Sequence, residues 1–282
     1  MEGTPWVPSI RYAPPVLNWW KSLSKRRRVR FWRGVSYVVF VILTIAFLLA
    51  VDWPRVIDTM FQPEIVAEQF PDILLIAAKN TIIYTILGFV GGLLLGLLLA
   101  LMRLSQSKPF RWAAATYIDV VRGIPLLVWI LLIGLGVPIA LGIRVPTTFG
   151  PGALALSLVM GAYMAETIRA GIEAVDRGQM EAARSLGMSY SKAMIWIILP
   201  QAFRLMIPPL TNEFILLLKD TSLVSAIGVT ITTKELTRWG RDGVIHSANA
   251  TPLVVAGLIY LLLTIPMTRF VSRLEKKAAK SR

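Results

Sequence analysis

Two long runs without charged residues constrain the fold of this chain more than any other feature. Residues 34–51 and 80–102 contain no Asp, Glu, Lys or Arg. About 20 apolar residues of helix cross the roughly 30 Å hydrocarbon core of a bilayer, where every backbone group must be hydrogen-bonded internally. Only 16% of the chain is charged, against about a quarter in a soluble domain. The sequence therefore predicts an all-α integral membrane protein.

Six membrane-spanning helices are expected, a five-helix core preceded by one extra helix. The expected spans are 34–51, 80–102 (starting a turn or two earlier, near residue 73), 123–143, a span within 145–165, 193–218 and 251–268. The fifth span contains Pro200, Pro208 and Pro209, which cannot donate backbone hydrogen bonds. A membrane tolerates a broken helix only where the gap is buried in protein or faces water, and such breaks often mark transport sites. We therefore expect a break at Pro208–Pro209, with residues 211–222 serving transport.

Small residues recur every four positions in the second span, at Gly88, Gly92, Gly96 and Ala100. Small residues one turn apart let two membrane helices approach closely. The pattern predicts a helix-packing seam. Two interpretations remain open: a seam in a bundle that rocks during transport, and a static packing face.

The net charge of +14 is distributed as in a membrane protein rather than on a nucleic-acid-binding face. With both termini inside, the inner segments hold 21 Lys and Arg and the outer segments hold 6, as the positive-inside rule requires. We expect a multi-pass protein of the bacterial plasma membrane with cytoplasmic termini, a basic N-terminal segment over 1–33, a first span that is retained, and a basic tail over 275–282. Contact with anionic membrane lipid is compatible with this charge, and no nucleic-acid partner is expected. The chain has no cysteine, and no metal site is expected.

A short polar segment between the fourth and fifth spans predicts two capped helices. Asp176 and Gln179 suit a helix N-cap and its reciprocal partner. Gly187 suits the left-handed residue that ends a helix, and Ser189 can cap the next one. Burial in lipid cannot stabilise such a polar helix, so it is expected to dock against another protein. The alternative is an ordinary charged cytoplasmic loop.

The segment Glu181-Ala182-Ala183-Arg184-Ser185-Leu186-Gly187, followed after nine residues by Ile197-Ile198-Leu199-Pro200, resembles the EAA signature of ATP-binding-cassette (ABC) importer permeases. From about residue 73 to residue 274 the chain resembles the polar-amino-acid branch of that family, the histidine/glutamate/glutamine/arginine/opine group. The residues that carry this resemblance are Val121-Arg122-Gly123-Ile124-Pro125-Leu126-Leu127, Tyr163-Met164-Ala165-Glu166-Thr167-Ile168-Arg169-Ala170-Gly171-Ile172, Gly178-Gln179-Met180, Gln201-Ala202 and Leu217-Leu218-Lys219-Asp220-Thr221-Ser222-Leu223. The helix over 34–51 departs from the family's five-helix core.

The resemblance implies a type I ABC importer permease bundle over 73–274, with a coupling loop over 171–193. A separate ATPase subunit would dock on that loop. The implied coupling residues are Gly178, Glu181, Ala182, Ala183, Arg184 and Gly187. The chain contains no Gly-x-x-x-x-Gly-Lys-Ser/Thr motif, so ATP and Mg²⁺ are expected on the ATPase and no cofactor on this chain. A second permease chain, identical or related, and an extracytoplasmic substrate-binding protein are the other implied partners.

Charged side chains at membrane depth are costly and are site candidates for that reason. The candidates for the substrate pathway are Asn80, Asn212, Glu213, Lys219, Asp220, Thr221 and Ser222. Structural roles, such as a Lys219–Asp220 cap, remain open for several of them. Glu166 with Arg169, and Asp119 with Arg122, are expected to form structural pairs along one helix face.

The favoured function is a permease subunit for polar amino acids with no catalytic residues of its own, and the sequence does not indicate which amino acid is carried. An ion-coupled secondary carrier is the alternative. The absence of an obvious inverted repeat disfavours it. A membrane scaffold without transport is a third possibility, against which the proline-rich fifth span argues.

Overall fold

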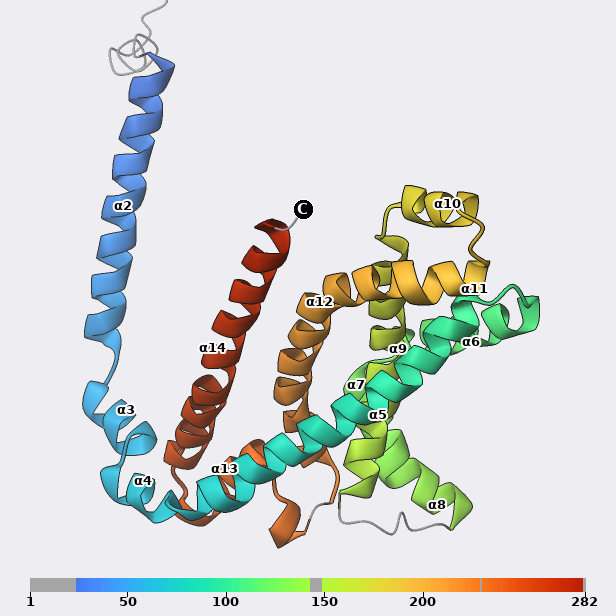
Figure 1. The fold of residues 1–282 in the computed structure, drawn as a ribbon. Helices are drawn as coiled ribbons and strands as arrows, with labels where there is room; N and C mark the ends of the chain where they lie inside the picture. The colour runs from blue at the N-terminus through green and yellow to red at the C-terminus, as the bar shows by residue number, and fades with distance from the viewer. Residues whose placement is uncertain (1–23, 143–148, 229, 281–282) are drawn as a thin grey trace, which may run out of the picture. The chain divides into compact units, whose positions relative to one another are not determined.

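The computed structural model describes residues 24–142, 149–228 and 230–280 (Figure 1). The chain divides into two compact units, residues 1–56 and 57–282. The first unit contains helix α2 (Lys25–Ala50) and the start of α3 (Trp53–Met60). The expected first span is helical, and its helix begins nine residues earlier than predicted, so the end of the basic segment 1–33 is continuous with the span. Residues 1–23 of that segment lie outside the described residues.

All the regular elements among the described residues of the second unit are helices. In chain order its elements are α4 (Pro63–Gln69), η1 (Ile73–Ala78), α5 (Lys79–Leu104), α6 (Lys108–Gly123), α7 (Leu126–Leu131), η2 (Leu132–Gly136), α8 (Val137–Leu141), α9 (Gly150–Glu173), α10 (Arg177–Ser185), α11 (Tyr190–Ala193), η3 (Met194–Ile198), α12 (Leu199–Asp220), η4 (Thr221–Ala226), η5 (Ile231–Thr233), α13 (Leu236–Ser247) and α14 (Thr251–Lys280). Segments η1, η2 and η3 are π-helical, and η4 and η5 are 3₁₀-helical.

Five helical segments of the described chain are long and apolar enough to cross a membrane. They are Lys25–Ala50, Ile73–Leu104, Gly150–Glu173, Tyr190–Ala226 and Thr251–Arg273. Each corresponds to an expected span. The second begins at Ile73, as predicted.

The expected third span, 123–143, is wrong at its start, because its helical part begins at Leu126, after a bend. Helix α6 and the segment Leu126–Leu141 form a pair bent by 101°. The bend falls at Ile124–Pro125, where Ile124 is extended (φ −110°, ψ 133°), because the proline ring disfavours helical geometry in the residue before it. The 16 residues after the bend rise only about 24 Å as a helix, so this part of the chain is a broken span or a re-entrant segment.

The predicted helix break at Pro208–Pro209 is also wrong. Helix α12 runs without interruption from Leu199 to Asp220, with both prolines inside it. The ribbon instead changes direction within α12 (Figure 1). Pro208 is buried, and packing against neighbouring helices is what lets a membrane helix bend at proline without breaking.

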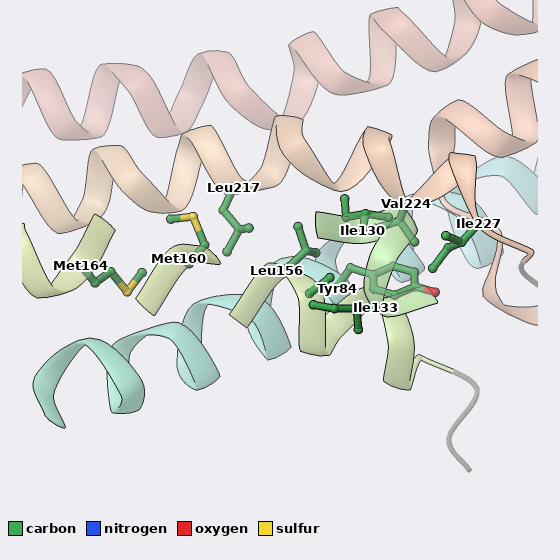
Figure 2. Close-up of a cluster of buried hydrophobic side chains, with 10 residues drawn as sticks. Tyr84, Ile130, Ile133, Leu156, Met160, Met164, Leu217, Val224 and Ile227 are labelled. Carbon is green, nitrogen blue, oxygen red and sulfur yellow. The ribbon is translucent and has the colours of Figure 1, made fainter. Parts of the chain in front are cut away.

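The predicted small-residue seam joins α5 to α9. A Cβ atom placed on Gly88, Gly92 or Gly96 would come within 2.9, 2.7 and 2.8 Å of the Cβ atoms of the α9 residues Leu156, Met160 and Met164, respectively. These α9 residues continue into a buried cluster that includes Tyr84 of α5, Leu217 of α12 and Val224 of η4 (Figure 2). The close helix packing is thus confirmed, and whether the seam moves during transport stays open.

A second buried cluster holds η1, at the start of the second span, to α13 and α14. It consists of Ile73, Ala77, Ala78, Leu236, Val255, Ala256 and Ile259. The cluster fixes the start of the second span against α13 and α14.

Candidate functional site

Helices α10 and α11 form the polar segment predicted between the fourth and fifth spans. The Asp176 side chain accepts a hydrogen bond from the Gly178 backbone N–H at 2.7 Å, and Ser189 Oγ accepts from the Lys192 N–H at 3.3 Å. Both N-caps are as predicted. The reciprocal contact from Gln179 is not formed, because its Oε1 instead accepts from Gln201 Nε2 at 3.3 Å.

The end of α10 is a Schellman turn. Gly187 has a φ of +83°, the left-handed conformation that glycine adopts without strain. The Gly187 N–H donates to the Arg184 carbonyl at 3.0 Å, and the Met188 N–H donates to the Ala183 carbonyl at 3.2 Å. Arg184 also donates from its guanidinium to the Met188 carbonyl at 2.9 Å, so this side chain fixes the turn that it flanks.

One face of α10 is anchored and the other is exposed. Ala183 is buried, and Met180 packs against a cluster of Ile168, Ile172, Val175, Ile198, Ala202 and Met206. The remaining predicted coupling residues are exposed: Gly178, Glu181, Ala182, Arg184 and Gly187. Leu186 is 85% exposed. Figure 1 shows α10 beyond the ends of α9 and α11.

A charged cluster lies near the same end of α9. Arg169 donates to Glu166 at 2.7 Å and to Glu173 at 2.6 Å, and Arg103 of α5 lies 3.7 Å from Glu166. The predicted Glu166–Arg169 pair is therefore confirmed. Asp119 and Arg122 form no ion pair in the described chain. The Arg122 guanidinium instead lies over the Tyr163 ring, 5.2 Å from its centroid.

The candidate pathway residues fall into two groups. Asn80 is buried, and its Nδ2 donates to the carbonyls of Thr232 and Lys234 at 2.8 and 2.9 Å. Thr221 is buried, and its hydroxyl donates to the Leu218 carbonyl at 2.7 Å. These two side chains are occupied by contacts within the chain.

The other candidates remain accessible. Asn212 and Lys219 are exposed, while Glu213, Asp220 and Ser222 are half-buried. They project from α12 and the start of η4. Glu213 lies within electrostatic range of Asp220 and of Arg122 from α6. Glu213 is thus the half-buried carboxylate that the structure brings within electrostatic range of Arg122, just before the bend at Ile124–Pro125.

Glu235 is a buried acidic group that the sequence analysis did not single out. Its carboxylate accepts hydrogen bonds from the backbone N–H groups of Thr237 and Arg238 at 2.6 and 2.7 Å, and from the Tyr260 hydroxyl at 3.0 Å. Burial raises the pKa of Glu235 from 4.5 to about 7, although these hydrogen bonds act to lower it. The available signal was its position before Leu236, where an acidic residue can cap a helix.

Comparisons with known proteins agree with this architecture. The family described as "binding-protein-dependent transport system inner membrane component" matches residues 92–280. The probable glutamine ABC transporter permease protein GlnM of Bacillus subtilis is 38% identical over 210 residues, covering 72% of this chain and 91% of that protein. The arginine transport system permease protein ArtQ of the same organism is 39% identical over 186 residues, covering 66% and 83%. The glutamate/aspartate import permease protein GltK of Escherichia coli is 36% identical over 206 residues, covering 71% and 90%.

Solved structures of ABC transporters also resemble this chain. A chain from the crystal structure of an amino acid ABC transporter with histidines is 38% identical, with a TM-score of 0.69, and the match covers 75% of this chain and 96% of that chain. A chain of the MetNI methionine ABC transporter, at 19% identity and a TM-score of 0.55, shares the fold. These relatives do not favour the alternative of an ion-coupled carrier. This chain is a multi-pass inner membrane protein that belongs to the binding-protein-dependent transport system inner membrane components, the permease subunits of ABC transporters.

Proposed function

We propose that this permease imports a polar amino acid and is driven by a separate ATPase subunit that binds ATP and Mg²⁺. The relatives named above are permeases for glutamine, arginine and glutamate or aspartate. We therefore assign this chain their shared substrate class, polar amino acids, and not any one amino acid. The chain itself binds no cofactor and catalyses no chemical step.

The ATPase docks on the outer face of α10 and on the turn that follows it. The observation that carries this assignment is the anchored inner face of α10 combined with an outer face on which Leu186 is 85% exposed. Burying one leucine side chain contributes about 1.5–3 kcal/mol. Glu181 and Arg184 supply exposed charges on the same short helix, and the small exposed residues Gly178 and Ala182 leave room for a partner. Gly187 shapes the turn. Ala183 is buried beneath them and anchors the helix to the permease.

The docked helix passes force to the membrane-spanning helices. Its inner face packs on residues near the ends of α9 and on η3 and α12. A short helix held by a packed cluster moves as a nearly rigid body. Closure of the ATPase pair therefore tilts α9 and α12 together. This rigid-body movement on the cytoplasmic side opens the pathway on the extracytoplasmic side.

The substrate passes along α12, between this chain and a second permease chain that is identical or related. Asn212, Glu213 and Lys219 are accessible in the single chain, and an exposed charge at membrane depth costs about 2.5–3.5 kcal/mol on insertion scales. A water-filled pathway between two permeases removes that cost. Glu213 can pair with the substrate ammonium group. Asp220 and Ser222 flank the path, while Asn80 and Thr221 position the backbone around it.

Both termini of the permease lie in the cytoplasm, on the side of the ATPase. This orientation rests on the excess of Lys and Arg in the segments that it places inside. An extracytoplasmic binding protein then delivers the amino acid at the face that carries α13. There, Asp242 pairs with Arg238 at 3.1 Å and with Lys234.

The docking surface is tested by co-purification of the permease with its cognate ATPase. We expect Leu186→Glu to abolish the association. Ile245→Glu is the matched control, since Ile245 is 77% exposed on α13 and outside the membrane spans. Equal recovery of the ATPase with both variants would place the docking surface elsewhere.

The transport role is tested by amino-acid uptake in vesicles with and without the ATPase. Gly187→Val places a β-branched residue at positive φ and should abolish ATPase-dependent uptake in a protein that still inserts. Gly142→Val is the control, because Gly142 also has positive φ (+64°) and lies outside α10 and α11. Undiminished uptake without the ATPase would overturn the proposal in favour of an ion-coupled carrier.

A further inference from the structure

The first turns of α2 carry a dense group of positive charges. Five exposed basic residues lie within its first nine positions: Lys25, Arg26, Arg27, Arg30 and Arg33. No Asp or Glu occurs from residue 24 to residue 51, so the helix supplies no counter-charge of its own. Positive charge in the first turn also opposes the helix dipole, whose N-terminal end is positive.

Three of these residues form a stripe on one face. Arg26, Arg30 and Arg33 are spaced by four and three positions, and residues at these spacings are neighbours on a helix surface. Like charges at such positions destabilise a helix. Anions that bind this stripe from outside the helix would offset both the repulsion among its charges and their unfavourable interaction with the helix dipole. Phosphate groups suit guanidinium side chains because two parallel N–H groups can bind one phosphate.

The length of α2 places this stripe at the level of lipid headgroups. Its 26 residues span about 39 Å at 1.5 Å per residue, whereas the hydrocarbon core is about 30 Å thick. The uncharged residues 34–51 fill about 27 Å of that core. Residues 25–33 add about 13 Å to this run, so α2 extends about 9 Å beyond the core, where phospholipid phosphates lie.

An apolar groove continues the stripe toward the membrane interior. It is lined by Arg30, Phe31, Gly34, Val35, Val38 and Val39. Arg30, Gly34 and Val38 follow one another at four-residue spacing on the same helix face. A Cβ atom at Gly34 would have no neighbour within 4 Å, so the missing side chain leaves the groove open. A guanidinium above an apolar channel matches the layout of a phospholipid, with its phosphate above an acyl chain.

We propose that this face of α2 is a binding site for an anionic phospholipid. The stripe of Arg26, Arg30 and Arg33 binds the headgroup phosphate, and one acyl chain lies in the groove beside Gly34. Positive residues beside a span also orient it in the membrane. Orienting the span requires only positive charge near its end, whereas the aligned stripe and the groove match the headgroup and one acyl chain of a single lipid molecule.

The absence of cysteine from the chain allows a local measurement of lipid binding. Ile42→Cys, one turn beyond Val38 on the same face, carries a bimane label in the full permease–ATPase complex. The complex is placed in vesicles of equal parts phosphatidylglycerol and phosphatidylcholine, with either lipid brominated to quench the label. Leu49→Cys, at the far end of α2, reports the bulk lipid.

We expect brominated phosphatidylglycerol to quench the label at Ile42→Cys more strongly than brominated phosphatidylcholine, with no such preference at Leu49→Cys. Arg30→Gln should reduce the preference about fivefold, which corresponds to about 1 kcal/mol for one basic residue near a membrane surface. Arg30→Lys, which keeps the charge, should retain most of it. Gly34→Leu should reduce quenching by both lipids, because its side chain fills the groove.

The proposal fails if the two lipids quench the label at Ile42→Cys equally. It also fails if the preference is the same at Leu49→Cys, which would indicate enrichment of the bulk lipid, or if Arg30→Gln leaves the preference unchanged. The Arg30→Gln variant keeps the other basic residues of the segment, so its insertion is preserved. Because the readout is lipid contact, the result does not depend on amino-acid transport.

Discussion

The seam between α5 and α9 makes a quantitative prediction about Gly96. A Cβ atom at this position would lie 2.8 Å from the Cβ of Met164, 3.1 Å from the backbone N of Ala165 and 3.1 Å from the backbone O of Gly161. Favourable contacts between carbon atoms lie at about 3.5–4.0 Å. Since none of these three atoms moves when a side chain changes rotamer, Gly96→Ala forces the two helices apart.

The free-energy cost of Gly96→Ala can be judged against the same change at a glycine with no close neighbours. Adding a methylene-sized group to a well-packed core costs about 1–3 kcal/mol. In a soluble helix, the higher helix propensity of alanine would offset this cost by about 1 kcal/mol. That gain is mostly absent here, because a membrane helix stays helical when its packing is lost. Gly257→Ala in α14 is the control, since a Cβ atom there meets nothing within 4 Å.

We expect Gly96→Ala to lower the free energy of unfolding by about 1–3 kcal/mol and Gly257→Ala to change it by less than about 0.5 kcal/mol. The measurement is the midpoint temperature at which the purified protein in detergent loses its monodisperse state on heating. At about 2–4 °C for each kcal/mol, the two variants should differ clearly. Equal midpoints would show that the seam does not hold the helices together, and the argument from close approach would be refuted.

Three further predictions concern polar side chains. Burial raises the pKa of Glu235 from 4.5 to about 7, so its contribution to stability is present below about pH 4.5 and about 3 kcal/mol of it is lost as the pH rises through 7. The thermal midpoint of Glu235→Gln should be nearly independent of pH, while Glu68→Gln should keep the wild-type dependence of the midpoint on pH. The wild-type pH dependence in both variants would refute the assignment. Asn80→Ala removes two part-buried hydrogen bonds, to the carbonyls of Thr232 and Lys234, and should cost about 2 kcal/mol without changing which amino acids compete for uptake. A changed preference would return Asn80 to the pathway. Glu213→Gln should reduce uptake or alter its selectivity at an unchanged thermal midpoint, and unaltered transport would remove Glu213 from the pathway.

Local hydrogen bonds were the most predictable part of the site. The caps at Asp176 and Ser189 and the turn at Gly187 each involve residues within five positions of one another. Their geometry follows from the short polar side chain or from the glycine. The Gln179 contact was predicted wrongly because a partner from α12, Gln201, competes for its side chain.

Both errors in the predicted spans involve proline, at Pro125 and at Pro208–Pro209, in different packing environments. Hydropathy alone started the third span at Gly123, before the bend at Ile124–Pro125, although proline restricts the residue before it whatever the composition around it. At Pro208–Pro209 the restriction was expected to break the helix, but α12 continues. Proline sets a local preference, and packing by neighbouring helices decides whether the helix ends or bends. Packing is a long-range property that sequence spacing does not report.

Long-range contacts also explain why the role of Asn80 and the burial of Glu235 were not predictable. The acceptors of Asn80 lie 152 and 154 positions away in the sequence, and Glu235 receives a hydrogen bond from Tyr260 in another helix. Within residues 24–142, 149–228 and 230–280, by contrast, the side chains of Asn212, Glu213 and Lys219 take part in no hydrogen bond or ion pair. A membrane helix does not keep charged groups exposed to lipid without a partner, because their desolvation is costly. The side chains that the chain satisfies by itself therefore build the permease, and those that it leaves unsatisfied along α12 are where water, substrate and a second permease chain belong.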